Sequence, residues 1–224
     1  MNFQVVTLFP ERYSAYIETG LPARALKKGL YKLHLAQLRD FADPDRNGRV
    51  DDEPYGGGPG MVVQIGPVER AIESLPEKLP VVLFTPRGEL LNQEMIRKFS
   101  CMRGFTLISG YYEGVDERVA ENLVDYQVSL GNFVLNSGDL PALCFIDALS
   151  RLIPGYMGSP ESLLEESNED GLLEYPQYTR PARYKDWGVP EVLLSGNHKK
   201  IADWRKEMSI ATTEMRMNEN ERKG

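Results

Sequence analysis

Short apolar runs alternate with helical patterns between residues 80 and 152, and no other feature restricts the possible folds as strongly. The runs have the length and the apolar composition of buried strands. The apolar runs are residues 80–85, 104–109 and 125–130, and the helical patterns that follow them are 92–102, 116–122 and 141–152. Because strands that alternate with helices build parallel sheets covered on both sides, the sequence predicts an α/β fold whose mostly parallel sheet has helices on both faces.

Each of these three strands runs directly into a glycine-bearing loop. The loops read TPRG, SGYYEG and SLGNFVLNSGDLP. In open α/β sheets, ligands bind outside the carboxyl ends of the strands. One such loop would be an ordinary turn, but three at matching positions predict one small-molecule pocket made largely of backbone.

The preceding segment of the chain adds further elements and one long loop. Strands are expected at 3–8 and 31–38, and helices at 11–17, 23–28 and 67–75. The loop at 39–60 ends in the segment DDEPYGGGPGM, whose glycines allow another molecule to approach the main chain closely. It is not a Walker A sequence, because Met61 and Val62 stand where that motif needs a Lys and a Ser or Thr. Dinucleotide binding is excluded as well, since no loop reads G-x-G-x-x-G after a first strand.

The net charge and the small number of histidines limit the partners and the reactions that the protein can be expected to have. A net charge of −7 argues weakly against a nucleic-acid partner, although local clusters such as Lys199-Lys200 could form a basic patch. Taken singly, each basic cluster is better explained as a solvated face. With only His34 and His198, a zinc site or a histidine-based nucleophile is not expected, and we expect no metal-ligand cluster in the protein. What remains is acid–base or group-transfer chemistry carried by carboxylates and arginines.

The sequence also predicts where the protein works. Cys101 and Cys144 lie in apolar contexts and are expected to be buried free thiols in a reducing compartment. No apolar run is long enough to cross a membrane, and the first residues lack the basic segment of a signal peptide. We therefore expect a cytoplasmic protein with no membrane partner.

A series of longer motifs resembles a known family. In order, they read LFPE, VDDEPYGGGPGM, GYYEGVDERV, LGNFVLNSGDLPA, SRLIPG, GLLEYPQYTRP and LLSGNHKKIADWR. Together they resemble the bacterial tRNA (guanine-N1)-methyltransferases of the SPOUT class, over about residues 1–208. The resemblance implies a deep trefoil knot, binding of S-adenosylmethionine, and an obligate homodimer whose active sites use both subunits. It also implies methylation of N1 of the guanine immediately 3′ of the tRNA anticodon, at position 37, with Mg²⁺ needed for turnover at an unknown site.

The resemblance assigns binding residues position by position. The expected cofactor-binding residues are Pro86, Gly88, Gly110, Tyr112, Glu113, Leu130, Gly131, Asn132, Phe133, Val134, Leu135, Gly138 and Pro141. The expected substrate-binding residues, for the anticodon stem-loop, are Asp51, Tyr55, Gly58 and Gly60. The chain departs from the family pattern at Tyr111, where the family usually has Arg, and at Ser137, where it usually has Gly.

The reaction requires the guanine N1 proton to leave as the methyl group arrives. A carboxylate base suits this step, together with a cation that stabilises negative charge on the neighbouring O6. The resemblance implies that Arg151 is this cation and that Glu166 is the base, at a position where the family typically has Asp. Asp170 is an alternative base.

The same resemblance predicts three regions of the chain. They are a knotted cofactor-binding domain at 1–154, a flexible linker at 155–170, and a small helical C-terminal domain at 171–224, shortened after Met208. The C-terminal domain is expected to hold a helix from about 197 to 208, followed by a polar tail. Two alternative functions are a catalytically weakened paralogue that acts as a cofactor- or RNA-binding module, and a SPOUT methyltransferase that acts on another RNA.

Overall fold

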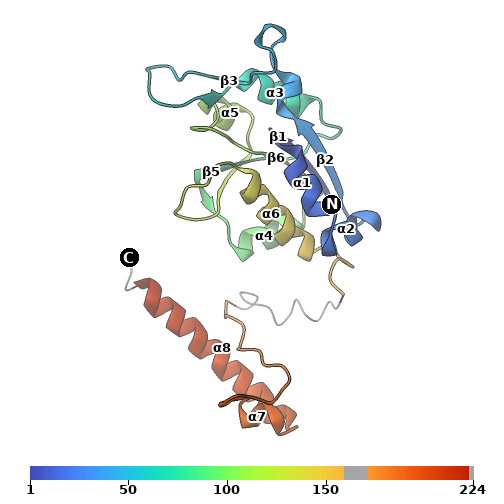
Figure 1. The fold of residues 1–224 in the computed structure, drawn as a ribbon, viewed down its shortest axis with the longest axis vertical. Coiled ribbons are helices and arrows are strands. Elements are labelled where there is room, and N and C mark those ends of the chain that lie inside the picture. Colours follow the sequence, from blue (N-terminus) through green and yellow to red (C-terminus); the bar gives the residue numbers. More distant parts are fainter. Residues whose placement is uncertain (159–170, 222–224) are drawn as a thin grey trace. The chain divides into compact units, whose positions relative to one another are not determined.

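The computed structural model describes residues 1–158 and 171–221. The chain divides into two compact units, Met1–Gly158 and Ser159–Gly224. The first unit is built on a five-stranded sheet in which every pairing is parallel, in the order β2-β1-β6-β5-β7 (Figure 1). Its strands are β1 (Asn2–Thr7), β2 (Lys32–Gln37), β5 (Val81–Leu90), β6 (Gly104–Ile108) and β7 (Tyr126–Ser129).

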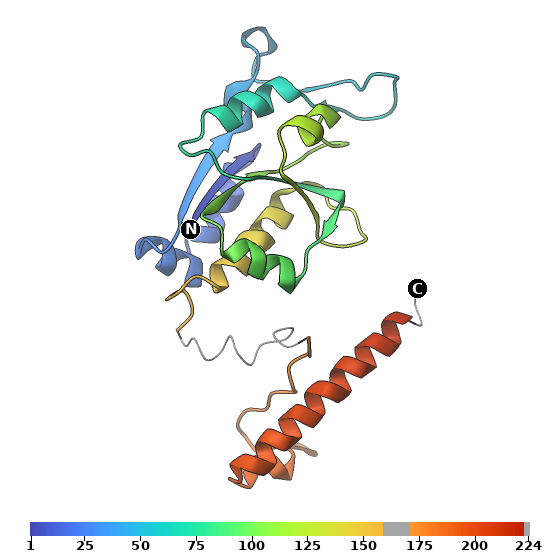
Figure 2. The same cartoon turned by 180° about the vertical axis from the view of Figure 1, so that it is seen from behind.

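Helices cover both faces of this sheet (Figure 2). One hydrophobic core lies under α1 (Pro10–Ile17), α2 (Gly20–Lys27), α4 (Gln93–Ser100) and α6 (Asp139–Arg151). The second lies under α3 (Ile65–Glu73) and α5 (Glu117–Asn122). Because successive strand residues point to opposite faces, Val82 belongs to the first core and Leu83 to the second. The predicted fold class, a mostly parallel α/β sheet with helices on both faces, is therefore confirmed.

Aromatic rings fill the first core. Phe99, Phe105 and Phe145 are almost fully buried, and their ring centroids lie 5.1 to 5.7 Å apart in tilted or edge-to-face contacts. Burying each such side chain contributes about 1.5–3 kcal/mol to folding. These contacts fix α4 and α6 against the sheet, and α6 begins at the end of the loop that follows β7.

The long loop before α3 contains short elements of its own. These are the 3₁₀ turns η1 (Leu38–Phe41) and η2 (Pro44–Arg46) and the strands β3 (Asp51–Asp52) and β4 (Val62–Val63). The two strands pair antiparallel, with Asp51 opposite Val63. The glycine-rich segment therefore connects the strands of a hairpin, and two of the three carboxylates before it, Asp51 and Asp52, belong to a strand.

The described part of the second unit, residues 171–221, contains a small hairpin and two helices. They are β8 (Arg183–Tyr184), β9 (Trp187–Gly188), α7 (Glu191–Leu194) and α8 (His198–Glu221). The expectation that the last helix ends near Met208 is wrong. Residues 209–221 contain neither Gly nor Pro, so nothing in the sequence stops the helix there. Thr213 is buried and accepts a hydrogen bond from the Leu173 backbone N–H, at 2.8 Å from N to Oγ1, so this extension packs within the unit.

Several other expectations have an outcome here. Strand β5 does not end at residue 85 but continues to Leu90, with a register shift between Phe84 and Glu89. Cys101 and Cys144 are free but exposed, because each lies on the solvent side of an amphipathic helical segment. Within residues 1–158 and 171–221, no helix is long and apolar enough to cross a membrane. Most of the expected linker, including Glu166 and Asp170, lies outside the described residues. The threading of a knot stays a prediction.

Candidate functional site

A cavity of about 440 Å³ opens beside the register shift in β5 and at the carboxyl ends of β6 and β7. The three glycine-bearing loops predicted to meet at this edge of the sheet all contribute to its wall. The lining includes Pro86 and Arg87, the segment 110–115, Glu117, Ser129, Leu130, the segment 133–138, and Pro141. The wall therefore combines backbone, apolar side chains and a few charged groups.

Most of the residues expected to bind a cofactor line this cavity. They are Pro86, Gly110, Tyr112, Glu113, Leu130, Phe133, Val134, Leu135, Gly138 and Pro141. Their role toward a ligand stays a prediction. Gly88, Gly131 and Asn132 do not line the cavity. A Cβ at Gly88 would lie 2.4 Å from the Val128 backbone nitrogen, so this glycine serves the close pairing of β5 with β7.

Sequence reasoning missed several polar residues of the wall. Arg87 and Glu117 form an ion pair there, and Asn136 lies in the loop before α6. Arg87 stands between two residues that were singled out, Pro86 and Gly88, so its place in the loop was a usable signal. Glu117 offered none, because it reads as an ordinary first-turn residue of a helix.

The expected substrate residue Asp51 and the expected cofactor residue Tyr112 lie close together. Burial raises the pKa of the Tyr112 phenol, and the nearby Asp51 carboxylate adds to this shift. Asp51 also pairs with Arg49, at 3.6 Å between Nε and Oδ2. Tyr112 has a φ of 60°, a conformation that costs a non-glycine residue about 1–3 kcal/mol and is concentrated at functional sites.

The glycine-rich hairpin is anchored at one end of the cavity and open at its tip. The Glu113 N–H donates to the Met61 carbonyl at 3.1 Å, and the Val63 N–H donates to the Gly114 carbonyl at 3.0 Å. Gly60 has a φ of 83°, and a Cβ there would lie 2.5 Å from the Glu113 carboxylate. Tyr55 is fully exposed, and around Gly56 and Gly57 an added Cβ would meet nothing within 4 Å.

Arg151 stands away from the cavity of its own chain. It is the last residue of α6, whose other end contributes Pro141 to the wall. At about 1.5 Å per residue, the two positions lie about 15 Å apart along the helix axis. Burial raises the pKa of the Tyr156 phenol, and the neighbouring Arg151 charge opposes that shift. Within a single chain, the described residues therefore do not bring Arg151 and the cavity together.

Metal ligands do not gather in the described residues of the chain. Among residues 1–158 and 171–221, no group of three or more His, Cys, Asp or Glu side chains is placed to hold a metal ion. The geometry thus assigns no Mg²⁺ site to these residues.

A parallel α/β sheet with a cavity walled by backbone-rich loops at its edge is the architecture of a class of proteins that bind small molecules at that edge. Comparison with known proteins identifies the family within this class. The sequence profile described as tRNA (Guanine-1)-methyltransferase TrmD matches residues 1–221. The chain belongs to this family and is a methyltransferase enzyme.

The individual relatives agree with the family profile. A tRNA (guanine-N(1)-)-methyltransferase of Microcystis aeruginosa is 50% identical over 220 residues, which cover 96% of this chain and 94% of the relative. The corresponding protein of Clostridioides difficile is 44% identical over 221 residues, which cover 96% and 95%. The crystal structure of tRNA (m1G37) methyltransferase from Aquifex aeolicus matches with a TM-score of 0.81 at 40% identity, covering 96% of this chain and 93% of that one.

Proposed function

We propose that this enzyme transfers a methyl group from S-adenosylmethionine to N1 of the guanine immediately 3′ of a tRNA anticodon, position 37. The observation that carries this proposal is the cavity beside β5 and at the ends of β6 and β7, in a chain of the TrmD family. The similarity to the crystal structure of tRNA (m1G37) methyltransferase from Aquifex aeolicus supports the position of the target base.

The cavity suits a ligand of the size and chemistry of S-adenosylmethionine. Its volume of about 440 Å³ lies within the usual range for small-molecule sites, about 300–1,000 Å³. Leu130, Leu135 and Pro141 offer an apolar surface for a purine ring, and the loop backbone offers hydrogen-bonding groups to its edges. When bound, S-adenosylmethionine supplies an electrophilic methyl group.

Residues of the chain then have two tasks at the guanine. Glu166, or alternatively Asp170, accepts the N1 proton, and Arg151 stabilises the negative charge that develops on O6. Asp51, Tyr55, Gly58 and Gly60 belong to the hairpin beside the cavity, and they receive the target base after it leaves the anticodon-loop stack.

A second copy of the chain completes the proposed site. Arg151 lies about 15 Å along α6 from the cavity wall, which supports an active site in which a partner subunit supplies the arginine for each cavity. The apolar side chains of Phe133, Val134 and Leu140 are 56%, 84% and 57% exposed beside the cavity, as expected of a surface that a second subunit covers. The proposed assembly is therefore a homodimer with shared active sites, in the cytoplasm, with Mg²⁺ required for turnover.

Methyl transfer from labelled S-adenosylmethionine tests this proposal. The substrates are unmodified tRNA with guanine 3′ of the anticodon and the same tRNA with adenine there, in the presence of Mg²⁺. We expect transfer to the first and none to the second. Glu166→Gln abolishes turnover with cofactor binding intact, whereas the matched control Glu165→Gln leaves the rate unchanged. Cofactor binding without transfer to any tRNA would instead support a non-catalytic binding module, and transfer only to another RNA would support a different substrate.

Subunit mixing tests the shared site separately. Arg151→Ala is expected to be inactive as a homodimer, and a cavity variant such as Gly138→Ala is expected to have little activity at a cofactor concentration far below its weakened Kd. Mixed dimers carry one intact site, so random mixing recovers about a quarter of the wild-type activity. No recovery in dimers shown to contain both variants would contradict a site built from two chains.

A further inference from the structure

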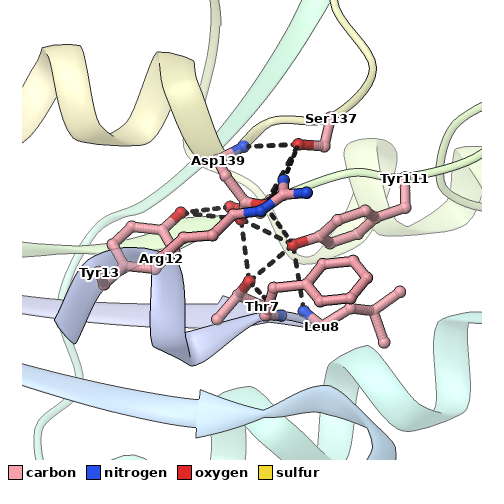
Figure 3. A network of polar contacts seen from close by, with 9 residues as sticks. Thr7, Leu8, Arg12, Tyr13, Tyr111, Ser137 and Asp139 are labelled. Atoms are coloured by element: carbon pink, nitrogen blue, oxygen red, sulfur yellow. Dashed lines mark hydrogen bonds and ion pairs between the residues drawn. The ribbon is translucent and has the colours of Figure 1, made fainter. Parts of the chain in front are cut away.

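Asp139 is a completely buried carboxylate directly behind the cavity wall. It is the first residue of α6 and follows Gly138, which lines the cavity. Thr7, Arg12, Tyr13, Tyr111 and Ser137 all donate hydrogen bonds to its two oxygens (Figure 3). Burying a carboxylate is costly unless it is paired and hydrogen-bonded. The five donors therefore offset the cost of burying the Asp139 charge.

Four of the five donors are neutral hydroxyl groups, and three of these come from separate elements. Tyr111, from the loop after β6, lies 2.7 Å from both oxygens of Asp139. Thr7 at the end of β1 and Tyr13 in α1 donate to Oδ1 at 2.9 and 3.1 Å. Burial raises the pKa of both Tyr111 and Tyr13, and the Asp139 charge adds to this shift, so these phenols keep their protons for donation.

The positive charge comes from α1. Arg12 Nη1 lies 2.6 Å from Asp139 Oδ2 and 3.1 Å from the Ser137 hydroxyl oxygen, and its guanidinium stacks on the Phe9 ring at 4.7 Å. Among the residues that the structure describes, Arg12 is the only cation that pairs with Asp139. Ser137 also donates to Asp139 Oδ2 at 3.2 Å. Arg12 and Asp139 therefore both bind Ser137, which lies in the loop before α6.

The network joins the two loops that form most of the cavity wall. Tyr111, Ser137 and Gly138 line the cavity, and the Gly138 N–H donates to the Gly110 carbonyl at 2.8 Å. Arg12 and Asp139 do not line it. A neutral Tyr111 cannot balance the charge of Asp139, and Arg12 does so.

We propose that Arg12 and Asp139 are positioning residues that set the cofactor affinity of this enzyme, by holding segment 136–138 against Gly110. The inference rests on the proposed cofactor and goes beyond it, because neither residue touches the cavity. Loss of Arg12 leaves a buried carboxylate without a counter-charge, and the loop that carries it shifts to bring the carboxylate toward water. Catalysis at the guanine uses other groups, so the chemical step is unaffected once the cofactor is bound.

Calorimetric binding of S-adenosylmethionine and of S-adenosylhomocysteine to the full chain is the direct test. Arg12→Gln is expected to weaken both by roughly tenfold, a moderate loss for a charge pair because the Arg12 side chain is 47% exposed. Steady-state kinetics should show the same rise in KM for the cofactor, with kcat and the KM for tRNA unchanged. Arg12→Lys recovers part of the affinity. The matched control Arg24→Gln, at an exposed position of α2, binds like the wild type.

Charge neutralisation separates positioning from a general loss of structure. The double variant Arg12→Gln/Asp139→Asn removes the unbalanced charge and should bind more tightly than Arg12→Gln alone. If Arg12→Gln does not fold, Ser137→Ala, which removes the hydroxyl between cation and carboxylate, should still weaken cofactor binding severalfold. Wild-type affinity in a folded Arg12→Gln protein, or equal loss of cofactor and tRNA affinity, overturns the inference. A wild-type chain that binds neither ligand overturns the proposed function instead.

Discussion

Gly138→Ala tests the packing of the cavity wall most sharply. The Gly138 backbone has φ −75° and ψ 0°, which alanine tolerates, so any effect comes from the added methyl group. That group would lie 2.8 Å from the Gly110 nitrogen and 2.9 Å from the Ser109 Cα, both backbone atoms that cannot rotate away. Ordinary contact begins near 3.4 Å, so the loop must move by about 0.6 Å, which stretches the hydrogen bond from Gly138 to Gly110.

Overpacking of this kind costs about 1–3 kcal/mol. If this cost destabilises the loop conformation that binds the cofactor, cofactor affinity drops by about 5- to 150-fold. The assay is calorimetric titration with S-adenosylhomocysteine at a temperature where the variant is folded. Gly158→Ala is the control, since an added Cβ there meets nothing within 4 Å. Affinity within twofold of wild type for Gly138→Ala would refute the packing described here.

Three further predictions concern other regions of the molecule. Gly60→Ala displaces the Glu113 carboxylate and places an alanine in the left-handed conformation, which costs about 1–2 kcal/mol of stability. The midpoint of urea unfolding should therefore shift to a lower urea concentration, and the rate of methyl transfer should fall. An unchanged midpoint would contradict this prediction. Burial raises the pKa of Tyr111 above its usual 10.0, so the stability that this phenol contributes is complete below about pH 10 and is lost as the pH rises further. Urea unfolding from pH 8 to 11 should therefore show a smaller alkaline loss of stability for Tyr111→Phe than for the wild type. An identical loss in both proteins would exclude this contribution of Tyr111. Trp187 and Tyr184 are 68% and 58% exposed, and the Lys185 ammonium lies over both rings. Because a base stacked on an aromatic ring contributes about 1–3 kcal/mol, Trp187→Ala should raise the KM for tRNA about fivefold or more and leave cofactor binding unchanged. A wild-type KM for tRNA would show that this hairpin takes no part in tRNA recognition.

The sheet and the position of the cavity could be predicted from the sequence because both depend on local patterns. Apolar runs such as Val81–Phe84 have few alternatives to a buried strand, and parallel strands bring their carboxyl ends to one edge. The same local reasoning went wrong at Gly88. It sits in a glycine-bearing loop by sequence, yet β5 resumes through it and uses its missing Cβ to approach Val128.

The polar network around Asp139 could not be predicted in this way. Its members come from positions 7 to 139, and no spacing rule links Thr7 or Arg12 to a carboxylate so far along the chain. The exposure of Cys144 was missed because its sequence neighbours in α6 are mostly apolar, so the sequence did not indicate that Cys144 faces the solvent. The length of α8 was missed because a polar sequence resembles a disordered tail until a contact such as Leu173 with Thr213 is known.

Mapping the methyl group on the product tests the central claim most directly. Unmodified tRNA is incubated with the enzyme and S-adenosylmethionine, digested with nucleases, and analysed by mass spectrometry against standards of the methylguanosine isomers. The account predicts 1-methylguanosine in the fragment that contains the nucleotide 3′ of the anticodon, and in no other fragment. Methylation of another atom, of another nucleotide, or of no nucleotide by an enzyme that binds the cofactor would contradict it.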